Sequence, residues 1–419
     1  MTDKQQLLSD FKFYSSYSKF KKEDERMETW EEAIDRVMQM HYKKYENKIT
    51  PKLQDYLNFA TKQYKEKRIL GSQRALQFGG DSILKHEMKQ FNCLVSYCDR
   101  VEFFKEAMYL LLCGCGVGFS VQTLHVEKLP MIGKRIEGVK TFLIEDSIEG
   151  WADAIGVLLA SYSLSDIKFQ DYYGYRIDFD YSNIRPKGSY ISGGFKAPGY
   201  EGLKNSLTKI QELLDKEING NVQIPLKSII AYDIVMHMAD AVLSGGVRRS
   251  ATICLFSATD NDMLNAKTGD WYIKNPQRGR SNNSVILIRN KTSKELFSKI
   301  MESVKSWGEP GFVWSSNEDI IYNPCVEIGM TPYYIDENEN KISGWEGCNL
   351  TEINGSKCNS EQEFYDACKA SAILGTLQAG YTNFKYVTDV TKKIFDKEAL
   401  LGCSITGFMN NPVILFNPE

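Results

Sequence analysis

The sequence predicts an α/β protein in which helices and strands alternate in a layered or barrel arrangement. From about residue 70 onward, short apolar segments bounded by glycines alternate with stretches of helical periodicity. The length of 419 residues suits one large domain with appendages, since single α/β barrels run well beyond about 200 residues. With 42% hydrophobic and 25% charged residues, the composition is that of an ordinary globular protein.

The N-terminal part is expected to form a helical region that precedes this domain. Residues 28–45 predict a surface helix, because Thr29 and Glu32 form a capping box at its start. Its apolar residues recur every three or four positions and therefore share one face: Trp30, Ala33, Ile34, Val37, Met38 and Tyr42. Residues 52–68 predict a second helix. We therefore expect a helical region over residues 1–70 and an α/β domain over residues 71–419.

A run of glycines follows the helix predicted over residues 101–112. Gly114, Gly116 and Gly118 stand at alternate positions, which allows close backbone approach or unusual φ values, and a strand is expected to follow. A dinucleotide-binding fingerprint follows a strand and not a helix, so a phosphate loop is poorly supported here. A tight packing turn and a turn that lines a substrate both remain open. Further along, the sequence predicts helices over residues 228–243 and 293–307 and strands over residues 253–256, 285–288 and 312–314.

Two glycine-containing loops carry cations that suit an anionic ligand. In the first loop, exposed backbone N–H groups would cradle an anion between the cations. The second loop follows the helix over residues 228–243, and its paired arginines suit phosphate or carboxylate recognition. Solvated loops without a ligand are the alternative for both. The residues concerned are Arg185, Lys187, Gly193 and Gly194 in the first loop, and Gly246, Arg248 and Arg249 in the second.

The densest group of reactive side chains surrounds Cys325, with a second cysteine at Cys348. Pro324 fixes its own φ and disfavours a helical conformation at the residue before it, so a stiff loop or strand is expected. On an extended backbone, Asn323, Cys325 and Glu327 would point to the same side. A thiol between a carboxamide and a carboxylate suits catalysis. A buried structural cysteine beside a surface glutamate is the alternative.

Charge and cysteine usage argue against several classes of protein. The formal net charge is −3 without long runs of one sign, which argues against general binding to nucleic acid or to a membrane surface. No segment approaches the roughly 18 apolar residues of a spanning helix, and the N-terminus lacks a signal-like segment, so the cytoplasm is expected. Ten cysteines without a Cys-x-x-Cys pair, and only four histidines, support neither a metal site nor a disulfide framework.

Several motifs in a fixed order carry a family resemblance. They are residues 91–93 (Phe-Asn-Cys), 116–120 (Gly-Val-Gly-Phe-Ser), 184–188 (Ile-Arg-Pro-Lys-Gly), 246–251 (Gly-Val-Arg-Arg-Ser-Ala), 281–285 (Ser-Asn-Asn-Ser-Val), 308–311 (Gly-Glu-Pro-Gly), 323–328 (Asn-Pro-Cys-Val-Glu-Ile) and 348–350 (Cys-Asn-Leu). Together they resemble the catalytic chain of ribonucleotide reductases, especially the monomeric adenosylcobalamin-dependent (class II) type. The resemblance implies a ten-stranded α/β barrel of two five-stranded halves, with the catalytic cysteine on a finger loop through its middle.

The resemblance also implies roles for single residues. Cys325 would carry a transient thiyl radical that abstracts the 3′ hydrogen of the substrate ribose, Glu327 would accept the 3′-hydroxyl proton, and Asn323 would hold the sugar. Cys93 and Cys348 would supply two electrons as the 2′-hydroxyl leaves as water, and would end as a disulfide. These residue types suit the reaction, because an unactivated C–H bond resists acid–base attack and needs a radical, while a carboxylate can remove the neighbouring proton.

Ligands and partners follow from the same resemblance. It implies adenosylcobalamin as cofactor, a ribonucleoside diphosphate or triphosphate as substrate, an external dithiol as reductant, and a nucleoside triphosphate effector. The two cationic loops resemble the specificity loops through which an effector influences base choice, with Arg248 as the best candidate to reach a nucleotide. Two alternatives stay open: a class I catalytic subunit without its own cofactor, whose radical comes from a separate metal-containing subunit, and a catalytically silent nucleotide-binding barrel.

The sequence departs from the family pattern at its C-terminal end. Members of the family continue beyond the segment that matches residues 402–407, and the continuation includes the turn that binds substrate phosphates and a cysteine pair that re-reduces the disulfide. The barrel encoded here is therefore expected to be incomplete. We expect a second polypeptide to supply the C-terminal half.

Overall fold

The computed structural model describes residues 3–163, 168–189, 196–243 and 251–416. Its internal contacts divide the chain into two compact units. The first unit comprises Met1–Asn92, Gly347–Lys385 and Phe395–Glu419, and the second comprises Cys93–Glu346 and Tyr386–Ile394. Both units combine helices with strands, so the predicted α/β class is confirmed.

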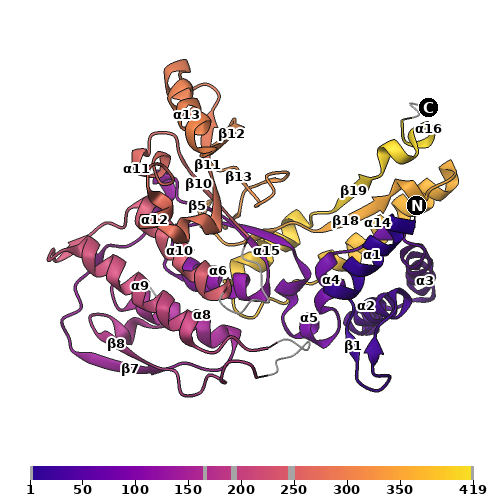
Figure 1. The fold of residues 1–419 in the computed structure, drawn as a ribbon, viewed down its shortest axis with the longest axis horizontal. Coiled ribbons are helices and arrows are strands. Elements are labelled where there is room, and N and C mark those ends of the chain that lie inside the picture. The colour runs from indigo at the N-terminus through magenta and orange to yellow at the C-terminus, as the bar shows by residue number, and fades with distance from the viewer. Residues whose placement is uncertain (1–2, 164–167, 190–195, 244–250, 417–419) are drawn as a thin grey trace. The chain divides into compact units, whose positions relative to one another are not determined.

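The N-terminal part of the first unit is mainly helical (Figure 1). The helix predicted over residues 28–45 is α2, and it begins at the predicted capping box, in which Thr29 Oγ1 accepts from Glu32 N and Glu32 accepts from Thr29 N. The predicted apolar face of α2 is buried at its centre, as Ile34 and Val37 show. The elements here are α1 (Asp3–Ser16), β1 (Phe20–Lys21), β2 (Arg26–Met27), α2 (Trp30–Lys44), α3 (Pro51–Lys65), β3 (Ile69–Leu70), α4 (Gln73–Phe78) and α5 (Asp81–Lys85).

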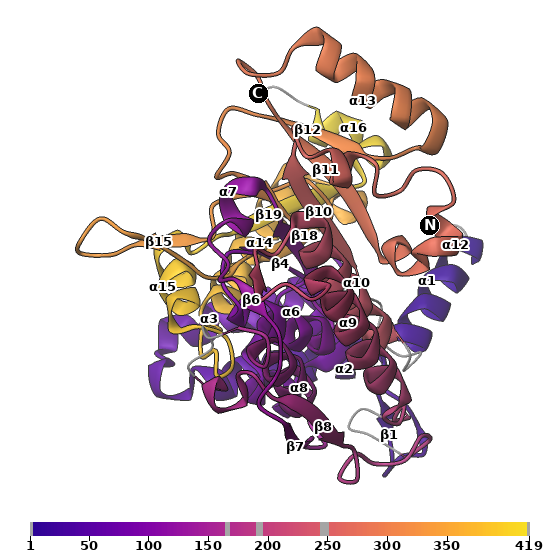
Figure 2. The same cartoon turned by 90° about the vertical axis from the view of Figure 1, so that its left-hand side faces the viewer.

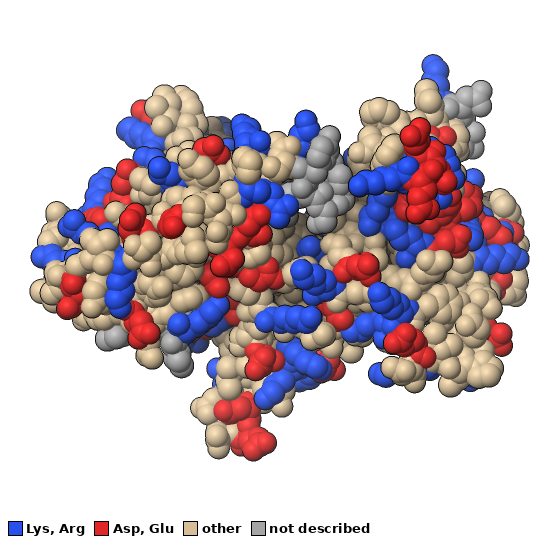
Figure 3. All heavy atoms as spheres, turned by 90° about the horizontal axis from the view of Figure 1, so that it is seen from below, with Lys and Arg blue, Asp and Glu red and all other residues tan. Residues whose placement is uncertain are grey.

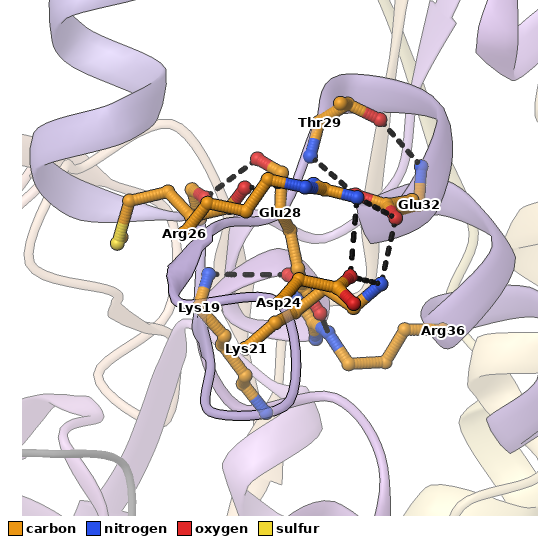
Figure 4. Close-up of polar contacts among 10 residues, drawn as sticks. Lys19, Lys21, Asp24, Arg26, Glu28, Thr29, Glu32 and Arg36 are labelled. Atoms are coloured by element: carbon orange, nitrogen blue, oxygen red, sulfur yellow. Dashed lines mark hydrogen bonds and ion pairs between the residues drawn. The ribbon is translucent and has the colours of Figure 1, made fainter.

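Charged side chains join the β1–β2 hairpin to the start of α2 (Figure 4). Arg26 donates to both carboxylate oxygens of Glu32, at 2.7 and 2.8 Å, and Arg36 donates to both oxygens of Glu28, at 2.7 and 2.9 Å. Lys19 Nζ donates to Gly79 O, directly after α4, at 2.7 Å. Burial, and the positive charge of Arg36 beside it, lower the pKa of Lys19 to about 8.

A three-stranded sheet completes the first unit. Its order is β19-β18-β3, with β18 (Leu350–Asn354) parallel to β19 (Gly402–Thr406) and antiparallel to β3. Helix α14 (Glu361–Ala379) packs against α3 and β18. The sheet therefore joins strands from opposite ends of the chain.

The second unit is built on a six-stranded sheet of order β12-β11-β10-β5-β4-β17. Adjacent strands from β12 to β4 are parallel, so each connection must cross over the sheet, and helices provide several of these crossings. Of the glycine run predicted to lead into a strand, Gly116 and Gly118 lie within β5, and Gly114 caps the end of the preceding helix with a φ of 87°. The strands are β4 (Cys93–Tyr97), β5 (Gly116–Ser120), β10 (Thr252–Ser257), β11 (Ser281–Ile288), β12 (Gly311–Ser315) and β17 (Glu346–Gly347).

Helices pack on this sheet and on one another (Figures 1 and 2). Contacts join α6 to α8 and to α10, and α9 to α8 and to α10. Helix α10 has the bounds predicted from the sequence, and Ser293 caps α13 by accepting from the N–H of Leu296. The helices are α6 (Glu102–Cys113), α8 (Ile148–Ala160), α9 (Glu201–Ile218), α10 (Ser228–Leu243) and α13 (Lys294–Trp307).

Shorter elements fill the connections. A parallel pair, β7 and β8, packs its aromatic residues Phe142 and Phe179 against α8. The hairpin of β15 and β16 projects from the second unit (Figure 2). These elements are α7 (Thr123–Val126), β6 (Ile132–Gly133), β7 (Val139–Leu143), β8 (Arg176–Asp180), β9 (Gln223–Ile224), α11 (Asn261–Leu264), α12 (Trp271–Lys274), β13 (Ile321–Tyr322), β14 (Gly329–Met330), β15 (Tyr333–Ile335), β16 (Lys341–Ser343), α15 (Asp389–Glu398) and α16 (Pro412–Leu415).

Two general expectations can be compared with this fold. The sheets contain six and three strands at most, so the ten-stranded barrel stays a prediction. Acidic and basic side chains are interspersed over the face in Figure 3, as expected for a formal net charge of −3. Within the described ranges, none of the helices has both the length and the apolar character needed to cross a membrane.

Candidate active site

The cysteine predicted to be catalytic lies on a tight hairpin loop. Strands β13 and β14 pair antiparallel, and residues 323–328, which we call the Cys325 loop, connect them. Val326 N donates to Asn323 O at 2.8 Å, and Ile328 N donates to the Asn323 side-chain oxygen at 3.1 Å. These bonds close the loop on itself. The predicted non-helical, stiff conformation is therefore present.

The side chains of the loop do not share one side as strand alternation predicted. Asn323 is fully buried, whereas Cys325 and Glu327 are exposed. The reason is a turn at residues 324–326, where Val326 adopts a φ of 67°. A β-branched residue rarely adopts this left-handed conformation, so the loop holds backbone strain beside its cysteine. Cys325 is thereby presented outward and does not pack as a structural thiol.

Asn323 combines a structural bond with an open donor. Its oxygen fixes the N–H of Ile328, while its Nδ2 has no hydrogen-bond partner among the described residues. A buried amide donor without a partner costs about 1–3 kcal/mol. A ligand that offers an oxygen to Nδ2 would recover this free energy.

Two glycines of β5 make room for the hairpin. A Cβ placed on Gly116 would lie 3.3 Å from both Cys93 Sγ and Pro324 Cγ, and one placed on Gly118 would lie 2.5 Å from Tyr322 O. The hairpin therefore packs directly on the face of β4 and β5 that carries Cys93, which we call the cysteine face. The glycine run is a packing strand under the loop, and the structure thus brings Cys93 and the Cys325 loop together.

Cys348 lies in the first unit, where a carboxamide network fixes its neighbour Asn349. Asn349 Nδ2 donates to Gly375 O at 2.8 Å and to Leu400 O at 3.0 Å. Its oxygen accepts from Gln378 Nε2 at 2.8 Å. Both Cys348 and Cys93 are buried in their own units. The approach of these two thiols to disulfide distance stays a prediction.

The cationic loops are described only in part. Arg185 Nε donates to Asp146 Oδ2 at 2.5 Å, so the Arg185 guanidinium already forms an ion pair with a carboxylate of this chain. Lys187 is exposed. Gly193, Gly194, Gly246, Arg248 and Arg249 lie outside the described residues. Their predicted role in effector binding stays a prediction.

A buried polar group near the loop was missed by sequence reasoning. Glu106 accepts from Arg100 at 2.6 Å, from Trp345 Nε1 at 2.8 Å and from Thr388 N at 2.7 Å. Glu346, which follows Trp345, accepts from Thr331 N at 2.9 Å, immediately after β14. This set braces the outgoing end of the hairpin. No spacing rule singles out Glu106, because two of its three partners, Trp345 and Thr388, are distant in sequence.

The described residues do not supply a metal centre of three or more His, Cys, Asp or Glu side chains. Of the histidines of the second unit, His125 is buried with Nδ1 against Ser120 Oγ, and His237 is half-buried on α10. Protein ligands to cobalt are therefore not identified among these residues.

Comparison with known proteins first relates this fold to the ribonucleotide reductases. No family model matches the chain. A crystal structure of a B12-dependent (class II) ribonucleotide reductase matches with a TM-score of 0.79 and 21% identity, over 96% of this chain and 62% of that one. This match shows a shared fold.

Curated relatives make the likeness more particular. A probable adenosylcobalamin-dependent ribonucleoside-triphosphate reductase of Dictyostelium discoideum is 29% identical over 281 residues, which is 64% of this chain and 34% of the relative. The adenosylcobalamin-dependent ribonucleoside-triphosphate reductase of Lactobacillus leichmannii is 26% identical over 343 residues, 72% of this chain and 44% of the relative. The chain thus spans less than half the length of these relatives. The resemblance inferred from the motifs is confirmed.

Proposed function

We propose that this chain carries the radical cysteine loop of a ribonucleotide reductase, which converts ribonucleotides to 2′-deoxyribonucleotides. The observation that supports this most directly is the exposed Cys325 on a strained hairpin loop, packed on the sheet face that carries Cys93. The likeness to named ribonucleoside-triphosphate reductases supports a triphosphate substrate.

In the proposed reaction, a thiyl radical on Cys325 takes the 3′ hydrogen atom of the ribose. Glu327 accepts the 3′-hydroxyl proton, and the 2′-hydroxyl takes a proton from the thiol pair and leaves as water. In all, the thiols of Cys93 and Cys348 provide two electrons and two protons, one proton to the departing water and one to C2′, and become a disulfide. Glu327 returns its proton to the 3′ oxygen. The Cys325 thiol returns its hydrogen atom to C3′ and regains the radical. An external dithiol reduces the disulfide again.

The loop geometry suits these roles. Asn323 offers its open, buried Nδ2 donor to an oxygen, which a ribose hydroxyl provides. Glu327 is exposed on the loop, so a substrate that approaches from solvent can reach its carboxylate. Because Ile328 N holds the Asn323 oxygen, the carboxamide is preoriented and its amino group alone is left for the substrate.

The names of the relatives support adenosylcobalamin as the cofactor. When bound, it would supply the initial radical through homolysis of its cobalt–carbon bond. The described residues identify no protein ligand for cobalt, so no step above depends on a contact with it. The proposal has three further parts. A nucleoside triphosphate effector binds the cationic loops, residues 71–419 belong to a ten-stranded barrel, and the protein is located in the cytoplasm.

Because the chain spans less than half the length of its relatives, the reductase assay includes a polypeptide with the part of a relative that this chain does not match. The test compares two cysteine variants in this assay with a ribonucleoside triphosphate, dithiothreitol and adenosylcobalamin. Cys325→Ser should abolish formation of deoxynucleotide while nucleotide binding persists. Cys403→Ser is the matched control, because Cys403 is also exposed but lies on β19, and it should keep activity. Activity retained by Cys325→Ser would refute the thiyl assignment. Activity without adenosylcobalamin would favour a radical from another subunit.

A further inference from the structure

The segment that leads into the Cys325 loop, residues 318–322, is held by hydrogen bonds far from the cysteine itself. Strands β4 and β5 pair so that Cys93 faces Gly116 and Tyr97 faces Ser120. Side chains alternate along a strand, so Tyr97 and Ser120 lie on the cysteine face, at the opposite end of the strands. This face therefore carries the reactive thiol at one end and polar groups at the other.

The segment that enters the hairpin lies along this whole face. At the polar end, Tyr97 Oη donates to Asp319 O, and Gln122 Nε2 donates to Glu318 O at 3.0 Å. At the thiol end, Tyr322 O lies over Gly118 and the ring of Pro324 over Gly116. Residues 318–324 thus run opposite to β4 and β5, and side-chain hydrogen bonds hold the polar end of this contact.

The donors at the polar end are themselves fixed. Ser120 Oγ lies 2.8 Å from His125 Nδ1 and accepts from Gln122 N at 3.2 Å and from Gln122 Nε2 at 3.1 Å. The Tyr97 ring stacks on the His125 ring, with centroids 3.9 Å apart. All these side chains are buried, and burial lowers the pKa of His125 to about 3, so its imidazole is neutral at neutral pH.

We propose that Tyr97 and Gln122 are positioning residues of the Cys325 loop. Their bonds to two consecutive carbonyls set the register of residues 318–324 on the cysteine face, and with it the place of Cys325 relative to Cys93. A slip by one residue would move the loop by about 3.3 Å. Reacting atoms must lie within about 3–3.5 Å of each other, so such a slip removes the reactive geometry.

The test uses variants that each remove the bond to one of the two carbonyls; Gln122→Met also removes the bond to Ser120 Oγ. Tyr97→Phe deletes the hydroxyl and keeps the ring on His125, and Gln122→Met deletes the amide and keeps the length of the side chain. Tyr162→Phe is the matched control, because it deletes another buried hydroxyl bond, to Asp215 at 2.7 Å, away from the loop. The readouts are amide hydrogen exchange over residues 317–328 and the rate at which iodoacetamide alkylates the exposed Cys325.

Loss of one such bond should raise loop exchange and Cys325 alkylation by about tenfold in both test variants, with α6 unchanged and the control at wild-type values. The proposal would be overturned if amide hydrogen exchange over residues 317–328 stayed at the wild-type rate in both variants. It would also be overturned if amide exchange rose uniformly across the second unit, because that would show a purely structural role.

The consequence for turnover rests on the proposed function. In the reductase assay, Tyr97→Phe should lower kcat and leave KM unchanged, because the loop and not the nucleotide site has moved. If loop exchange rises but the wild-type protein forms no deoxynucleotide, the positioning role stands and the proposed function fails.

Discussion

Replacing Gly118 by alanine tests how closely the Cys325 hairpin packs on the sheet. The new Cβ would lie 2.5 Å from Tyr322 O, and an ordinary contact begins at about 3.4 Å, so the hairpin has to move by roughly 0.9 Å. Movement of the strand instead is opposed, because the same Cβ would meet Val95 Cγ1 at 3.0 Å and Ile253 Cγ2 at 3.3 Å.

The expected cost has two parts. Overpacking of this kind lowers the free energy of unfolding by about 1–3 kcal/mol, which urea unfolding measures. Displacement of a reacting group by about 1 Å lowers the rate by about 10²-fold, so kcat should fall by about this factor in a protein that is still folded.

A matched control separates the position from the substitution. Gly279→Ala also adds one methyl group, but its Cβ would meet only the Trp271 ring, at 3.8 Å, an ordinary contact. This control should keep wild-type stability and turnover. The close packing of the hairpin on β5 would be refuted if the Gly118→Ala variant unfolded in urea, was alkylated at Cys325 and turned over substrate as the wild-type protein does.

Two further predictions concern buried charges. Glu106→Ala leaves Arg100 buried without its main partner and should lower the free energy of unfolding by about 3–5 kcal/mol in urea, whereas Glu212→Ala, from an exposed pair, should change it by under about 0.5 kcal/mol. Equal effects would contradict this assignment. The pKa of Lys19 is lowered from its ordinary value of 10.5 to about 8 in the folded protein. Between pH 8 and 10.5 the unfolded chain therefore binds more protons than the folded one, so the free energy of unfolding should rise with pH across this range. Lys19→Met should lose that rise, and an unchanged pH profile would speak against the burial of the ammonium group.

Local structure could be predicted where the signal lies within a few residues. The capping box of α2, the bounds of α10 and the Ser293 cap of α13 follow from hydrogen bonds and periodicity inside one turn or one helix. The motif around Cys325 likewise located the candidate site. Its side-chain directions were wrong, because a positive φ at Val326 interrupts the alternation, and no residue type at that position announces it.

The sequence by itself determined the α/β class and the principal helices, and it named the candidate reactive residues, whose roles stay a prediction. The tertiary structure alone decided that the hairpin packs against Gly116 and Gly118. It also decided that Asn323 is buried with an unbonded Nδ2 among the described residues, and that Tyr97 hydrogen-bonds the far end of the same segment. The physical reason is the separation in sequence: Tyr97 and Asp319 lie 222 positions apart in the chain, and only the tertiary fold lays residues 318–324 across the strands beside Cys93.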